Sequence, residues 1–169
     1  MNDESWTELD VVAHAVREDT DALGVFRVIG EAMDRLIGSR MLTFLRFDYD
    51  RFDMERVYCT IPGSYPIGER KAMRAGRWHE YVVDRGVAFI ASGAEEMRST
   101  FGDHAALAGL GVESTMCVPV RHRGRTLGTM NLNGEAGRYR HEHAALAQPF
   151  ATLAVPAFLA LASDAARPM

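Results

Sequence analysis

The chain has 169 residues, 47% of them hydrophobic and 25% charged, which is the composition of one ordinary globular domain. Its net charge is −4 and its basic residues are spread out, which argues against a nucleic-acid partner, because such binding needs a localised positive surface. The start of the chain lacks the apolar segment of a secretory signal, and no apolar run approaches the length of a membrane span. Two cysteines make no disulfide framework, so we expect a cytoplasmic protein without membrane contact.

Two amphipathic helices are predicted in the N-terminal part of the chain. The first covers about residues 2–17, where apolar residues recur at steps of three and four (Trp6, Leu9, Val12, Ala13, Val16). Asp19 or Thr20 is expected to cap the second, and Gly38 to end it.

The next segment predicts strands and a long loop. Met41–Tyr49 is apolar on both faces, which is typical of a strand in the middle of a sheet. A short turn follows, and Met54–Ile61 returns as the partner strand. Because Pro62, Gly63, Pro66 and Gly68 disfavour regular structure, residues 62–75 are expected to form a loop.

The middle of the chain predicts short helices around one more strand. Gly76–Asp84 is expected to be helical, and Val87–Ser92 to form a third strand. Two further short helices are predicted over Ala94–Phe101 and His104–Leu110, separated by a break at Gly102.

A β-hairpin is predicted from Ser114–Arg121 and Arg125–Asn133, joined by a glycine turn. On the second strand Thr129, Asn131 and Asn133 share one face by the two-residue period. Polar groups on a central strand need water or a ligand beside them. This face is therefore the first indication of a binding cavity.

The last predicted element is a helix over residues 139–162. It contains Pro149 and Pro156, so a kink or a break is expected. Residues 163–169 are expected to be a frayed tail. Short connections between consecutive strands favour an α+β fold with an antiparallel sheet. The terminal helices are expected to cover one face of the sheet, and the helical and loop insert the other.

These residues resemble a GAF domain, a PAS-like sensory module that binds small molecules. The resemblance extends over about residues 21–161 and rests on the strand MLTFLRF, the helical insert and the hairpin motif (Ser114-x-x-x-Val118-Pro119-Val120, Gly124, Leu127-Gly128-Thr129-Met130-Asn131-Leu132). It implies a single stand-alone GAF domain over residues 1–169, with an N-terminal helix in 1–19 and a core in 20–162.

The resemblance also implies a ligand pocket between the sheet and the insert. Carried to this sequence, the wall residues are Tyr58, Trp78, Tyr81, Phe89, Met97, Phe101, Met116, Thr129 and Asn131. The polar anchors are His79, Arg98, Asp103, His104 and Ser114. We expect no catalytic residue, cofactor or metal.

The segment around Asp103 has two interpretations. In one, Arg98 clamps a ligand carboxylate and His104 exchanges a proton near neutral pH. In the other, Asp103 caps the following helix while Arg98 and His104 face solvent. Trp78 is expected to pack in the core, to stack on a ligand, or to do both.

Two other groups of residues, the cysteines and a histidine-rich segment, suggest redox chemistry and metal binding, and each also has a purely structural interpretation. Free methionine-(R)-sulfoxide reductases share the GAF fold and use loop cysteines, but Cys59 and Cys117 both lie in apolar predicted strands. His141, Glu142 and His143 lack the helical spacing of a zinc site. Neither group is therefore expected to be catalytic.

Three functions follow from these expectations. The leading hypothesis is a non-catalytic sensory protein that binds a small polar or aromatic metabolite. The alternatives are an enzyme, acting through a cysteine or through Asp103 and His104, and a pure interaction module. Because the apolar stripes of the terminal helices exceed what one sheet face needs, we expect a homodimer formed through them.

Overall fold

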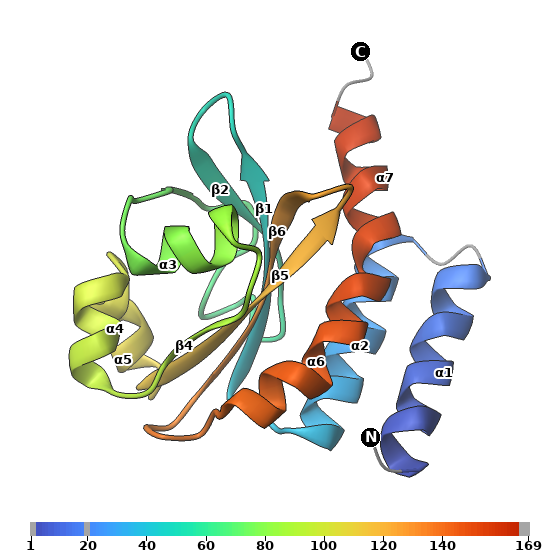
Figure 1. Ribbon diagram of the computed structural model, residues 1–169, viewed down its shortest axis with the longest axis horizontal. Helices are drawn as coiled ribbons and strands as arrows, with labels where there is room; N and C mark the ends of the chain where they lie inside the picture. The colour runs from blue at the N-terminus through green and yellow to red at the C-terminus, as the bar shows by residue number, and fades with distance from the viewer. Residues whose placement is uncertain (1–2, 19–20, 166–169) are drawn as a thin grey trace.

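The computed structural model describes residues 3–18 and 21–165 of the protein. Within these residues six strands form one antiparallel sheet in the order β3-β2-β1-β6-β5-β4 (Figure 1). The strands are β1 (Met41–Asp48), β2 (Asp53–Cys59), β3 (Arg70–Ala72), β4 (Phe89–Ala91), β5 (Ser114–His122) and β6 (Arg125–Gly134). The α+β fold with terminal helices is the one predicted from the sequence.

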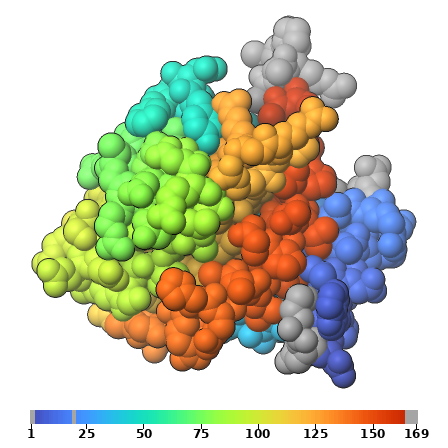
Figure 2. Space-filling model, viewed as in Figure 1, coloured from blue at the N-terminus to red at the C-terminus, as the bar shows by residue number. Residues whose placement is uncertain are grey.

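Helices cover both faces of the sheet. α2 (Ala22–Leu36), α6 (His141–Leu153) and α7 (Val155–Ala165) pack on one face, and α1 (Asp3–Arg17) packs outside them. Figure 2 shows α1 at the outer edge of the molecule, beyond α6 and α7. The other face lies under an insert made of β3, α3 (Arg77–His79), the π-helical turn η1 (Glu80–Asp84), α4 (Ala94–Thr100) and α5 (His104–Gly109).

A cluster of aromatic rings fills the core between the sheet and the helix layer. Phe26 of α2 stacks on Phe44 of β1 with 4.4 Å between ring centroids. Phe158 of α7 meets Phe26 edge-on at 5.4 Å. All three side chains are buried, and such ring pairs add to the stabilisation from the apolar area that they remove from water.

The central hairpin explains why the predicted motif contains Gly128. β6 lies between β1 and β5, and Gly128 pairs with Arg46 on one side and Val120 on the other. A Cβ atom at Gly128 would lie 2.0 Å from the Leu45 carbonyl oxygen and 2.5 Å from the Phe158 ring. Glycine therefore lets α7 pack directly onto the sheet at this position.

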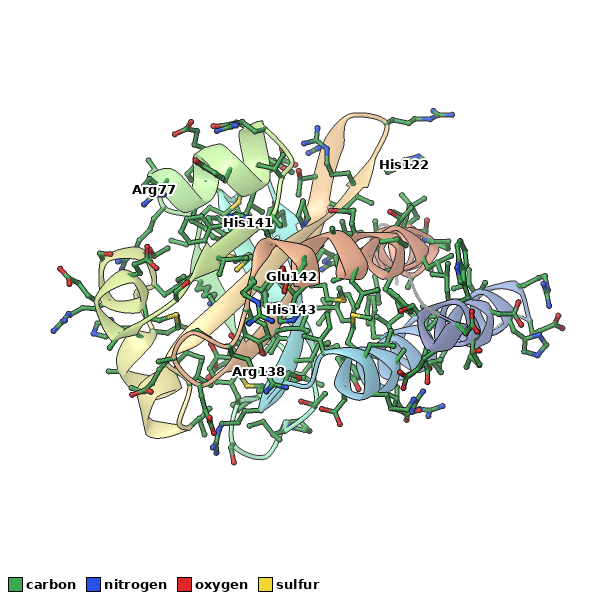
Figure 3. The ribbon with its side chains drawn as sticks, turned by 60° about the horizontal axis from the view of Figure 1, so that its bottom comes forward. Arg77, His122, Arg138, His141, Glu142 and His143 are labelled. Atoms are coloured by element: carbon green, nitrogen blue, oxygen red, sulfur yellow. The ribbon has the colours of Figure 1, made fainter. Side chains whose placement is uncertain are left out.

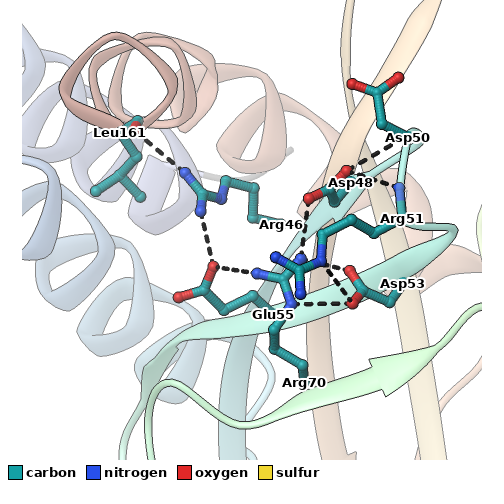
Figure 4. Close-up of polar contacts among 8 residues, drawn as sticks. All are labelled: Arg46, Asp48, Asp50, Arg51, Asp53, Glu55, Arg70 and Leu161. Atoms are coloured by element: carbon teal, nitrogen blue, oxygen red, sulfur yellow. Dashed lines mark hydrogen bonds and ion pairs between the residues drawn. The ribbon is translucent and has the colours of Figure 1, made fainter. Parts of the chain in front are cut away.

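The strand β3 lies inside the segment that the sequence predicts to be a loop, so this prediction is wrong for Arg70–Ala72. Arg70 holds the strand by charge pairing, with Asp48, Glu55 and Asp53 at 3.0, 3.0 and 2.9 Å from its guanidinium nitrogens (Figure 4). Glu55 also accepts a 2.7 Å hydrogen bond from Arg46. The prolines and glycines of this segment predict a loop, and they carry no information about ion pairs with residues elsewhere in the chain.

The helix ends also differ from the prediction. Asp21 caps α2 by accepting a hydrogen bond from the Gly24 N–H at 2.6 Å, whereas the predicted caps at positions 19 and 20 lie outside the described residues. The C-terminal helix breaks between α6 and α7, with a bend of 41°. Pro156 lies in the first turn of α7, where its missing N–H costs nothing, while Pro149 stays inside α6.

The predicted tail begins too early, because α7 continues through Ala165; positions 166–169 lie outside the described residues. Among the described helices none alone is long and apolar enough to span a membrane, and the bent pair α6–α7 meets that test only jointly.

Candidate functional site

A cavity of about 460 Å³ lies between the sheet and the insert. Its lining comes from β1, β2, β5 and β6 below, and from β3, the β3–α3 loop, α3, β4, α4 and α5 around it. This volume is in the range of small-molecule sites, which combine apolar walls with a few convergent polar groups.

The floor of the cavity is a row of hydrogen-bonded polar side chains. The Asn131 Nδ2 donates to the Thr43 Oγ1 at 3.2 Å, and the Asn133 Nδ2 donates to the Met41 carbonyl at 3.1 Å. The Thr115 hydroxyl donates to the Asn133 Oδ1 at 2.9 Å. Asn131 is only 6% exposed, and its Oδ1 is buried without a hydrogen-bond partner among the described residues.

A charged corner stands above this floor. The Asp103 Oδ2 accepts hydrogen bonds from the Lys71 ammonium at 3.0 Å and from the Tyr65 hydroxyl. Burial alone would raise the pKa of Asp103, but Lys71 and the hydrogen bonds together hold it below its usual value. Asp103 is thus a carboxylate at neutral pH, and its Oδ1 is buried without a partner in the described part of the chain.

Tyr65 connects this corner to the loop before β3. Its ring lies under the Arg56 guanidinium, 3.3 Å from the ring centroid, in a cation–π contact. Burial, and next the charge of Asp103, raise the pKa of Tyr65. The tyrosine is therefore a neutral hydrogen-bond donor to Asp103 and not a competing charge.

Aromatic side chains form the walls. Trp78 and Phe89 are 7% and 5% exposed, and Phe101 is half-buried beside them. Cys117 lies at the base of the cavity. Burial raises the pKa of Cys117 to about 11, against smaller lowering effects of Trp78 and Thr115. The Cys117 side chain is thus a neutral thiol at physiological pH.

Of the site residues expected from the sequence, the structure brings together those on the aromatic wall, the charged corner and the floor (Trp78, Phe89, Phe101, Asp103, Asn131). The interpretation of Asp103 as a residue that caps the helix with its side chain is wrong. Asp103 occupies the N-cap position of α5 but makes no capping hydrogen bond with its side chain.

Tyr58 and Met116 lie on the opposite side of the sheet from the cavity. Tyr58 packs against Phe26 with 6.1 Å between the rings, and Met116 is fully buried in the same core. Both were assigned to the wall without knowledge of the strand register. Because a strand alternates its side chains, an error of one position moves a residue to the other face.

Three residues of the insert also lie outside the cavity lining. His79 pairs with Asp84 at 3.4 Å from its Nδ1 atom, and Tyr81 packs on Phe89 at 6.1 Å between ring centroids. Arg98 is exposed on α4, as its solvent interpretation predicts. Met97 is buried under α4 and belongs to the core below the insert, outside the cavity lining.

The remaining predicted residues make internal contacts outside the cavity lining. The His104 Nδ1 hydrogen-bonds with the Phe101 carbonyl at 3.0 Å, and the Ser114 hydroxyl donates to the Glu135 carbonyl at 2.6 Å. Thr129 is fully buried two positions before Asn131 on β6, and its hydroxyl has no hydrogen-bond partner among the described residues. The pairing of Asp103 with His104 as an acid–base couple is therefore not formed.

The predicted site lacked several lining residues, notably Thr43, Tyr65 and Thr115. Lys71, Arg74 and Arg77 form a basic run in the sequence that either draws in an anionic metabolite or is the solvated surface of a loop, the second being favoured, and all three lie in the cavity lining. One signal was available for Thr43. It faces Asn131 across the β1–β6 pair, and both follow the same two-residue alternation. Tyr65 and Lys71 belong to the segment predicted to be a loop, where no periodicity reports which side chains point inward.

In the part of the chain that the structure describes, no three side chains of His, Cys, Asp or Glu lie together in a way that could hold a metal ion. Figure 3 shows His141, Glu142 and His143 at the start of α6, beside Arg138. The His143 Nδ1 instead accepts a hydrogen bond from the Arg140 N–H at 3.3 Å.

Comparison with known families now identifies the fold. The family model of the GAF domain matches residues 19–158, which is most of the chain. The protein therefore belongs to the GAF domain family. No curated protein matches the sequence.

Solved structures agree with this assignment. The chain is similar to the GAF domain of a phosphoenolpyruvate-protein phosphotransferase from Coxiella burnetii, with a TM-score of 0.77, 12% identity, and coverage of 97% of this chain and 98% of that one. It is also similar to free methionine-R-sulfoxide reductase from Neisseria meningitidis, solved with its substrate, with a TM-score of 0.64, 12% identity, and coverage of 97% and 95%.

A third similar structure is the chromophore-binding domain of a bacteriophytochrome from R. palustris, with a TM-score of 0.70 and 11% identity over 94% of this chain. This chain spans 62% of that domain. Identities this low show the shared fold alone.

Proposed function

We propose that this protein is a non-catalytic, cytoplasmic sensory GAF domain that binds a small polar or aromatic metabolite non-covalently in the cavity. The observation that carries the proposal is the cavity itself, about 460 Å³ in volume, with two buried acceptor atoms that lack partners among the described residues. These are the Asn131 Oδ1 and the Asp103 Oδ1. Leaving a buried acceptor unpaired costs about 1–3 kcal/mol, which a ligand with matching donors would recover.

Two of the similar proteins support this proposal. One is a chromophore-binding domain and the other was solved with its substrate. Both therefore hold a small molecule. In this protein the insert over the cavity would shift between pre-existing arrangements, provided that the ligand binds one arrangement more tightly than the other.

The redox alternative depends on Cys59 or Cys117 acting as a nucleophile. Burial raises the pKa of both thiols, that of Cys117 to about 11. Since the thiolate is the reactive form, a raised pKa disfavours a nucleophilic role for either side chain. Methionine sulfoxide reduction by the wild type would contradict the non-catalytic proposal. Loss of that activity in a Cys59→Ser/Cys117→Ser variant would then assign it to a thiol, whereas activity that survives this change would exclude the thiol route.

A thermal-shift screen over metabolites, including amino acids, cyclic nucleotides and purine and pyrimidine catabolites, tests the binding proposal. We expect at least one compound to raise the melting temperature. The Ala75→Trp substitution places an indole at the cavity lining and should abolish that shift. Ala105→Trp is the matched control, because Ala105 is exposed on α5 outside the lining. An Ala75→Trp variant that binds as well as the wild type would place the ligand elsewhere.

A further inference from the structure

The tip of the β5–β6 hairpin carries a dense run of basic side chains. Four of the five residues from 121 to 125 are basic, namely Arg121, His122, Arg123 and Arg125. Figure 3 shows His122 on this projecting end of the hairpin. Arg123 and Arg125 are exposed, and none of the three arginines forms an ion pair with a carboxylate of the described residues. The hairpin tip therefore presents positive charge that the fold itself does not neutralise.

The turn at this tip is built with an unfavourable residue. Arg123 and Gly124 both have positive φ angles, 48° and 79°, which is typical of a two-residue hairpin turn that prefers asparagine, aspartate or glycine. A long side chain is strained in this conformation. In the described part of the chain the Arg123 side chain makes no hydrogen bond or ion pair that would offset the strain. Strain that the fold does not require indicates a function for the side chain.

The arginines on either side of the turn are held in place. The Arg125 guanidinium lies 4.4 Å from the centroid of the Tyr49 ring, and the Tyr49 hydroxyl donates to the Thr126 carbonyl at 2.7 Å. The Arg121 Nη2 donates to the Gly124 carbonyl, while its Nη1 is buried without a partner among the residues described. A guanidinium that is already fixed loses little conformational freedom when it binds a partner.

Arg85 extends this basic surface from the insert. A Cβ atom at Gly86 would overlap the Arg121 guanidinium, so the end of η1 lies directly against the hairpin. η1 also contributes two carboxylates, but Glu80 pairs with Arg85 at 3.7 Å and Asp84 pairs with a histidine of α3 at 3.4 Å. The four arginines thus leave an excess of positive charge at this end of the sheet, which attracts and orients an anionic partner.

A protein segment rich in aspartate and glutamate fits this surface best. The planar guanidinium binds a carboxylate with two parallel hydrogen bonds, and several fixed guanidinium groups bind several carboxylates. Nucleic acid needs a wider positive surface, and the net charge of this chain is −4. Stable binding to a membrane surface needs an apolar anchor beside the charges, and residues 121–125 contain no apolar side chain.

We propose that the hairpin tip, formed by Arg121, Arg123 and Arg125 together with Arg85, is a docking surface for an acidic segment of a partner protein. The carboxylates of that segment pair with the guanidinium groups, and the tyrosine under Arg125 keeps that group oriented. None of the three hairpin arginines lines the cavity under the insert, so this surface is separate from the proposed ligand site.

Nuclear magnetic resonance titration of the ¹⁵N-labelled full chain tests this assignment. The probe is a peptide of alternating glutamate and serine, and its neutral counterpart has glutamine in place of glutamate. We expect the acidic peptide to bind at least about ten-fold more tightly and to shift the amide signals of Gly86 and Gly124. The affinity should fall as salt is added, because salt screens exposed charges.

Two variants separate a binding role from a structural one. Arg123→Asn should weaken binding and raise the melting temperature, because asparagine favours the positive φ angle. Arg123→Asn/Arg125→Gln should remove the advantage of the acidic peptide. Arg17→Gln/Arg98→Gln removes the same charge from exposed positions on α1 and α4 and should keep that advantage. The melting temperature confirms that each variant folds.

Four results would overturn the inference. They are equal binding or no binding of the two peptides, an equal loss of affinity in the tip variant and in the control, signal shifts that leave the hairpin tip unchanged, and binding of phosphatidylserine vesicles or duplex DNA without binding of the acidic peptide. The last result would assign the basic surface to a membrane or to nucleic acid. None of these results bears on the ligand-binding proposal, which the metabolite screen tests by itself.

Discussion

At the scale of single residues, the packing of α7 on the sheet depends on the close approach of β6, β1 and α7 around Gly128. Gly128→Ala should lower the free energy of unfolding by about 3 kcal/mol, because the new methyl group overlaps the Leu45 carbonyl, which cannot move out of a central strand. Urea denaturation followed by far-UV circular dichroism measures the change.

Gly63→Ala is the control for this substitution. A Cβ at Gly63 would meet no atom within 4 Å, so the expected change is within about 0.5 kcal/mol. Equal losses in the two variants would mean that the packing of α7 on the hairpin is looser than described.

A second prediction at this scale concerns Asp103 and acid stability. A carboxyl whose pKa is lowered on folding contributes stability above its unfolded pKa, near 3.9, and this contribution is lost as the pH falls through the folded pKa. Asp103→Asn should therefore destabilise the protein at pH 7 by about 1–2 kcal/mol and by less at acidic pH. Asp10→Asn, at an exposed position on α1, should leave the acid side of the pH–stability profile unchanged.

Melting temperatures between pH 3 and 7 supply this profile. If the melting temperatures of Asp103→Asn and the wild type differ by the same amount at pH 3 and at pH 7, the pairing of Asp103 with Lys71 does not contribute charge-dependent stability.

The residues also show what the sequence could predict. The face that carries Asn131 and Asn133 followed from the two-residue period, because a central hairpin with a clear glycine turn sets its own register. The prediction for Tyr58 was wrong, because β2 mixes charged and apolar residues on both faces and its register with β1 shifts at an irregularity between Phe44 and Leu45, which breaks the two-residue alternation. Lys71 was favoured as part of a solvated basic loop, because its inward direction is set by the pairing of β3 with β2, a contact that the local sequence does not show.

At the scale of elements, β3 is the segment whose position decides the shape of the cavity. Arg70 lies on the face of the sheet that carries Arg46 and Glu55, while its neighbour Lys71 reaches Asp103 on the cavity face. Arg46 in turn donates to the Leu161 carbonyl of α7 at 3.1 Å (Figure 4). The short edge strand β3 is thus held by side-chain contacts on both faces of the sheet, through Arg70 on one and Lys71 on the other.

Arg70→Gln should loosen β3 and destabilise the protein by about 1 kcal/mol at low ionic strength, with a smaller loss in 1 M salt because salt screens partly exposed pairs. Hydrogen exchange of the β3 amides should increase as well. Arg51→Gln is the matched control, since Arg51 is 68% exposed and lies 3.9 Å from Asp53. Unchanged exchange in Arg70→Gln would show that backbone pairing alone holds the strand.

The break between α6 and α7 shows a limit of prediction for elements. Two prolines in one apolar stripe indicated a kink or a break, and the break is present. The break lies at Ala154, and the new helix α7 packs Phe158 against Phe26 in the aromatic core. The position of a break is thus set by tertiary packing, whereas its occurrence follows from the missing backbone donors of proline.

At the scale of the whole molecule, the homodimer through the terminal helices stays a prediction. Trp6 and Val11 of α1, Leu23 of α2 and Leu159 of α7 are 59%, 45%, 51% and 39% exposed. Light scattering at micromolar concentration should give twice the chain mass, and Trp6→Glu should shift the protein toward the monomer. A wild-type monomer mass would contradict this prediction.

The central claim is that the cavity under the insert is a binding site for a small molecule. The most direct test is a crystal structure of the protein purified without refolding, in which a retained ligand would appear as density inside the cavity. The account predicts that this density lies between Trp78 and the Asn131 amide and approaches the Asp103 Oδ1. A cavity filled by the protein's own side chains, with Trp78 or Phe101 folded over the floor, would contradict it.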